Sequence, residues 1–150
     1  LAYQANASWL HHSAALKRTI RSPFDDSALL QAYLPERLLL RRLPAGDPGV
    51  VLAADPARGF VAELAGRGRT VSPHDPSLAE AARDADRDAA GQAWGALLAR
   101  ERIAWLLVNA ETASPALRAG LGRIGATRTD SVDRIELWRV PVSGPMDAVP

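Results

Sequence analysis

The stretch Arg-Ile-Ala-Trp-Leu-Leu-Val-Asn-Ala, residues 102–110, decides the fold of this chain. Its centre, residues 103–108, consists of six uncharged, mostly bulky apolar residues with no polar alternation. A strand with one face in water alternates between apolar and polar residues, whereas a strand covered on both faces does not. The shortness of the run and its β-branched and aromatic residues favour a strand over a helix. We therefore expect residues 103–108 to form a strand that is buried on both faces.

The segment before this strand has helical periodicity. Ala90, Ala93, Trp94, Leu97 and Leu98 fall on one face of a helix. A helix that leads directly into a doubly covered strand is typical of a parallel α/β layer.

Three predicted strands end in the same kind of dipeptide, an Asp or Ser followed by Pro. The Asp or Ser side chain accepts a hydrogen bond from the free N–H groups of a helix's first turn, and Pro is tolerated at the first helical position. The chain therefore repeats strand, cap and helix, which predicts parallel strands joined by right-handed crossovers. The predicted strands are residues 50–54, 69–72 and 103–108, and the dipeptides are Asp55-Pro56, Asp75-Pro76 and Ser114-Pro115.

Helices precede this repeat and a hairpin follows it. Residues 7–20 and 27–43 have apolar residues at helical spacing, with a break at Pro35, and residues 127–132 and 134–140 read as two strands joined near Asp133. We expect an α/β fold: three-layer and Rossmann-like, with a small parallel sheet, a C-terminal antiparallel hairpin and N-terminal helices. We expect one soluble domain, residues 1–150, with a helical lead-in (1–43), an α/β core (44–140) and a tail (141–150).

Composition narrows the classes of function. With 47% apolar residues the chain can bury a core, and its apolar runs are too short to span or insert into a bilayer. The formal net charge of +1 argues against a nucleic-acid partner. Cysteine is absent, the three histidines are His11, His12 and His74, and no glycine-rich phosphate loop follows a predicted strand. We predict no metal and no cofactor.

The candidate site is a group of polar residues that follow the predicted strands: Asp55, His74, Asp75, Asn109 and Glu111. In open α/β sheets, ligands bind beyond the carboxyl ends of the strands. Two carboxylates and an imidazole there would suit acid–base chemistry. The two aspartates are equally explained as helix caps, so no catalytic residue is assigned.

Several segments together resemble a known family. The segments are Ala-Tyr-Leu (32–34), Arg-Leu-Pro-Ala-Gly-Asp (42–47), Arg-Ile-Ala-Trp-Leu-Leu-Val (102–108), Leu-Gly-Arg-Ile-Gly-Ala (121–126) and Ile-Glu-Leu-Trp-Arg-Val (135–140). Their order resembles the soluble C-terminal domain of bacterial GT-C-type membrane glycosyltransferases, a group similar to the protein-mannosyltransferases and aminoarabinose transferases. The resemblance covers about residues 24–140.

This resemblance implies a piece of a longer membrane protein, on the periplasmic or other extracytoplasmic side of the inner membrane. The catalytic carboxylates of that family lie in the membrane core, so no site residue is carried over to this chain. The parent would be a polyprenyl-phosphate-sugar-dependent glycosyltransferase, and the partner of this domain would be the transmembrane part of its own parent chain. The domain itself would be non-catalytic.

Two rival interpretations remain open. The first is a stand-alone small α/β enzyme that uses the strand-end group around Asp55 and Asp75. The second is a nucleotide-binding or receiver-like module, which would require a lysine late in the sheet, whereas the only lysine is Lys17. Hydrophobic segments encoded upstream of Leu1 would favour the membrane-attached domain over the stand-alone enzyme. Sugar, acceptor and oligomeric state are not specified by the sequence.

Overall fold

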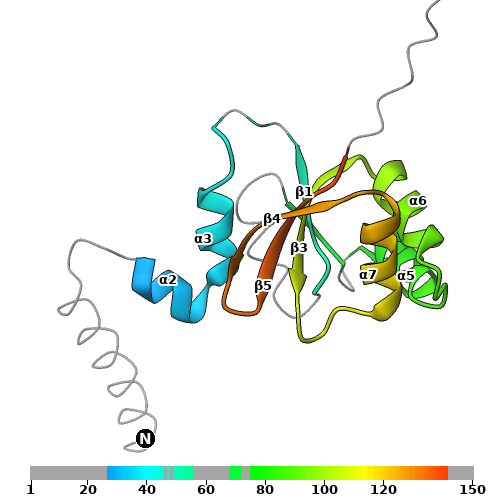
Figure 1. The fold of residues 1–150 in the computed structure, drawn as a ribbon, viewed down its shortest axis with the longest axis horizontal. Coiled ribbons are helices and arrows are strands. Elements are labelled where there is room, and N and C mark those ends of the chain that lie inside the picture. The colour runs from blue at the N-terminus through cyan, green and yellow to red at the C-terminus, as the bar shows by residue number, and fades with distance from the viewer. Residues whose placement is uncertain (1–26, 46, 48, 56–67, 72–74, 142–150) are drawn as a thin grey trace, which may run out of the picture.

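The computed structural model describes residues 27–45, 47, 49–55, 68–71 and 75–141. Within these ranges helices lie on both sides of a five-stranded sheet (Figure 1). The helices are α2 (Ser27–Tyr33), α3 (Pro35–Arg41), α5 (Pro76–Ala85), α6 (Gln92–Arg100) and α7 (Pro115–Arg123). The strands are β1 (Val50–Ala53), β2 (Gly68–Thr70), β3 (Ile103–Asn109), β4 (Thr127–Val132) and β5 (Ile135–Arg139).

The sheet combines a parallel half with an antiparallel half. Its strand order is β2-β1-β3-β5-β4. Strand β1 pairs in parallel with both β2 and β3, whereas β5 pairs antiparallel with β3 and with β4. This arrangement confirms the predicted α/β class, with its small parallel sheet and closing hairpin.

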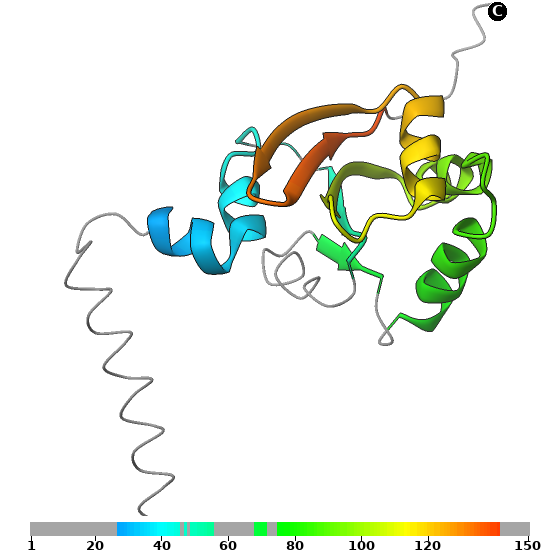
Figure 2. The same ribbon diagram turned by 60° about the horizontal axis from the view of Figure 1, so that its bottom comes forward.

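Strand β3 lies at the centre of the sheet, and all seven of its residues are buried. Trp105 and Leu107 pack into the core beneath α2 and α3, whereas Leu106 and Val108 pack into the core beneath α5, α6 and α7. Figures 1 and 2 show these two groups of helices on opposite sides of the sheet. The prediction of a strand covered on both faces is confirmed.

Helices α2 and α3 form one full layer of the fold. With the residue Leu43 that follows them, they supply five buried leucines to the same cluster as Val51, so the described part of the predicted helical lead-in, residues 27–43, belongs to the core. Pro35 occupies the first position of α3, as its fixed φ allows. The leucines are Leu30, Leu38, Leu39, Leu40 and, just after α3, Leu43.

Two of the three predicted caps are confirmed. The Asp75 side chain accepts a hydrogen bond from Leu78 N at 3.2 Å at the start of α5, and the Ser114 side chain accepts one from Leu117 N at 3.0 Å at the start of α7. The helix expected after Asp55 lies outside the described residues, as do the helix expected at 7–20 and tail residues 142–150.

The segment between α5 and α6 corrects the sequence prediction. Ala90 was expected on the apolar face of a helix, but α6 begins at Gln92 and Ala90 is exposed. The reason is Gly91, whose φ of 73° is left-handed and cannot continue a right-handed helix. The Asp88 carboxylate accepts hydrogen bonds from Ala90 N and Ala93 N, which stabilises this turn.

Candidate functional site

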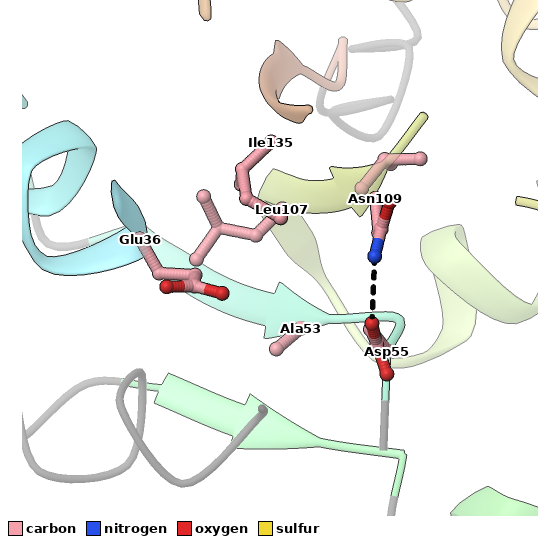
Figure 3. Close-up of a pocket in the computed structure, with 7 residues that line it drawn as sticks. Glu36, Ala53, Asp55, Leu107, Asn109 and Ile135 are labelled. Atoms are coloured by element: carbon pink, nitrogen blue, oxygen red, sulfur yellow. Dashed lines mark hydrogen bonds between the residues drawn. The ribbon is translucent and has the colours of Figure 1, made fainter. Parts of the chain in front are cut away.

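Two hollows meet beyond the carboxyl ends of β1 and β3. Both are lined by Asp55, Val108 and Asn109. Asn109 Nδ2 donates to Asp55 Oδ2 at 3.2 Å (Figure 3), so the residues that line both hollows include a hydrogen-bonded pair. Asn109 is itself buried and its Oδ1 accepts from Glu111 N at 3.0 Å, which fixes the orientation of its amide.

The smaller hollow lies on the α3 side of the sheet. Its volume is about 10 Å³, which is about the space of one water molecule. Its other lining residues are Glu36, Ala53, Leu107 and Ile135 (Figure 3). The Glu36 residue is 4% exposed. Burial of a carboxylate next to apolar side chains is uncommon, but the hollow is too small to admit an organic ligand.

The larger hollow is a crevice on the opposite side of the sheet, and we call it the α7 crevice. Its volume is about 320 Å³, within the range of small-molecule sites. One part of its lining is polar and another is apolar. The lining residues are Ala54, Asp55, Asp86, Trp94, Val108, Asn109, Thr112, Ala113, Ser114 and Leu117.

Asp86 connects the three helices around this crevice. It follows the last residue of α5, and its Oδ1 accepts from Trp94 Nε1 of α6 at 2.8 Å and from Ser114 Oγ, the cap of α7. The same hydroxyl oxygen accepts from Leu117 N. The carboxylate is therefore held in one orientation by groups from two other elements.

The predicted strand-end group is divided by the structure. Asp55 and Asn109 are bonded to each other, and Glu111 reaches Asn109 only through its backbone N–H. The Glu111 carboxylate forms an ion pair with Arg134 at 3.2 Å. His74 lies outside the described residues.

Asp75 is committed to another cluster. Its carboxylate forms an ion pair with Arg69 at 2.8 Å, and Arg69 also pairs with Glu101 at the end of α6. The hydrogen bond from Arg69, followed by that from Leu78 N, holds the pKa of Asp75 below its ordinary value. Asp75 therefore caps α5 and, through Arg69, connects β2 to the start of that helix. These interactions do not bring Asp75 to Asp55.

Sequence reasoning did not find Asp86 or Glu36. Asp86 lies in a run of alternating acidic and basic residues, where it has the appearance of a solvated helix face. Glu36 directly follows Pro35, where an acidic residue is expected to favour a helix N-terminus. At both positions, the neighbouring residues give no indication of which residues distant in sequence the side chain will contact.

A separate polar cluster lies at the start of β1. The Asp47 carboxylate accepts from Gly49 N at 2.7 Å, Trp105 Nε1 at 3.0 Å and Arg139 Nη1 at 2.8 Å. The Arg139 guanidinium also lies over the Trp105 ring, 4.6 Å from its centroid. The hydrogen bond from Gly49, together with those from Trp105 and Arg139, lowers the pKa of Asp47 against the opposing effect of burial. We call Asp47, Trp105 and Arg139 the Asp47 cluster.

Gly49 is required for this close approach. A Cβ at this position would lie 2.6 Å from Ala104 Cβ and 2.7 Å from Asp47 Oδ1, closer than real Cβ contacts. The chain therefore passes directly over β3 at this point.

Two general searches complete the description of the site. In the part of the chain that the structure describes, no three His, Cys, Asp or Glu side chains are grouped as a metal site requires. No described helix has the length and apolar character needed to cross a membrane. Comparisons with family models, with curated proteins and with solved structures found no match to the chain.

Proposed function

We propose that this chain is an extracytoplasmic accessory domain of an integral-membrane glycosyltransferase-like protein and is not catalytic by itself. In this role the domain packs on the outer face of the transmembrane part of its parent chain, on the periplasmic side of the inner membrane. It stabilises that part or shapes the entrance for the acceptor, while transfer chemistry with a polyprenyl-phosphate sugar takes place in the membrane core.

The observation that supports this proposal best is the Asp47 cluster. Three of the segments that resemble the glycosyltransferase domain each contribute one of its members: residues 42–47 supply Asp47, residues 102–108 supply Trp105, and residues 135–140 supply Arg139. Three of the five resembling segments therefore include a residue that connects distant parts of the fold. A domain that acts by packing against another part of its chain, and not by catalysis, is expected to resemble its family at such structural residues.

The hydrogen bonds made by the polar groups at and near the strand ends also support a structural role. Asp75 and Ser114 cap helices, and Asp86 joins α6 to the cap of α7. Catalytic carboxylates are instead expected to face a substrate position with their reacting oxygens.

The decisive test compares three proteins: the full-length parent, the parent without this domain, and the 150-residue chain alone. We expect sugar transfer by the parent, a lower folding yield or poorer acceptor use after deletion, and no transfer or hydrolysis by the chain alone. Catalysis by the chain alone would contradict the proposal and favour a stand-alone α/β enzyme that uses the crevice near Asp55.

The location has its own test, which uses a parent whose cysteines outside this chain have been replaced, since the 150-residue chain itself contains none. Ala119→Cys places a thiol at an exposed position of α7, and Ala82→Cys places one at a buried position of α5. In the parent expressed in cells, a membrane-impermeant maleimide should label the first variant and leave the second unlabelled until the protein is denatured. Labelling of Ala119→Cys only after the cells are lysed would place the domain in the cytoplasm and refute the proposal.

A further inference from the structure

We draw no further inference here: the strongest candidate, the α7 crevice beyond the carboxyl ends of β1 and β3, has one carboxylate, Asp55, that already has a partner and another, Asp86, that is exposed to water, and nothing in the described residues shows which ligand would occupy it.

Discussion

At the scale of single residues, Asp47 determines how the turn before β1 is attached to the sheet. Its bonds to Trp105 and Arg139 span 58 and 92 positions of the sequence. In the sequence, Asp47 lies in the Pro- and Gly-rich stretch 44–49, a composition that is typical of a turn. The partners were not predictable, because a turn pattern carries no information about which distant side chains the fold brings to it.

The first prediction follows from this residue. Asp47→Ala should lower the free energy of unfolding by about 2 kcal/mol, because it leaves partly buried donors of Trp105 and Arg139 without their charged acceptor. Denaturation by urea, followed by tryptophan fluorescence, measures this loss.

The control for this prediction is Asp84→Ala. Asp84 pairs only with the exposed Arg87 in the described structure, and its removal should change the free energy of unfolding by less than about 0.5 kcal/mol. If the two variants lost the same small amount, the Asp47 cluster would contribute nothing beyond an ordinary surface charge.

At the scale of elements, the helices and strands that were predicted best are those with an uninterrupted physical signal. Strand β3 was predictable because six apolar residues without alternation require cover on two faces, and α7 was predictable because Ser114-Pro115 marks its first turn. The start of α6 was misplaced by two residues, because apolar spacing alone does not reveal a left-handed glycine.

Gly91 also sets how closely α6 and α7 cross, and this gives the second prediction. A Cβ on Gly91 would lie 2.1 Å from the backbone N of Gly120 in α7, and the φ of Gly91 disfavours any side chain. Gly91→Ala should therefore cost about 3 kcal/mol or more, since neither backbone segment can move without separating the two helices. Thermal and urea unfolding both measure this cost.

Gly122 provides a matched control on α7. A Cβ there meets nothing within 4 Å, and the residue is exposed. Gly122→Ala should raise the stability by up to about 1 kcal/mol, because alanine loses less backbone entropy than glycine in a helix. A similar destabilisation by both substitutions would show that the crossing is not the cause.

At the scale of the whole molecule, carboxylates bound to cations or backbone N–H groups are distributed over the fold. The hydrogen bond from Arg42 lowers the pKa of Asp130 on β4, the hydrogen bonds from Arg69 and then Arg100 lower that of Glu101, and the bond from Ala93 N lowers that of Asp88. With Asp47 and Asp75, these groups connect loops, helices and both halves of the sheet.

The third prediction concerns the response of the whole fold to acid. A carboxylate whose pKa is lower in the folded chain stabilises that state fully above its unfolded pKa and loses this effect as the pH falls through the folded pKa. The free energy of unfolding should therefore be nearly constant above about pH 5 and fall steeply below about pH 4. Urea titrations at a series of pH values measure it, and Asp47→Asn should reduce the slope in the acidic range. A stability that rose on acidification would contradict this account.

The candidate site was predictable only in part. Asp55 and Asn109 could be placed together because the carboxyl ends of parallel neighbouring strands share one edge of a sheet. The α7 crevice could not be predicted, since its shape depends on where Asp86 contacts Trp94 and Ser114 once α5, α6 and α7 have packed together. Polar residues that directly follow a strand can be located from the sequence. A site formed where separate helices pack together can be located only from the structure.

The outermost strand of the antiparallel half, β4, has a further consequence. Its register with β5 shifts between Arg128 and Asp130, and its residues are mostly exposed and polar or charged. An exposed strand edge can recruit the same edge of another copy and begin aggregation, and a bulge with charged side chains interrupts the row of backbone donors and acceptors on which such pairing depends. Many copies of this domain can therefore be crowded together without their sheets joining through the β4 edge.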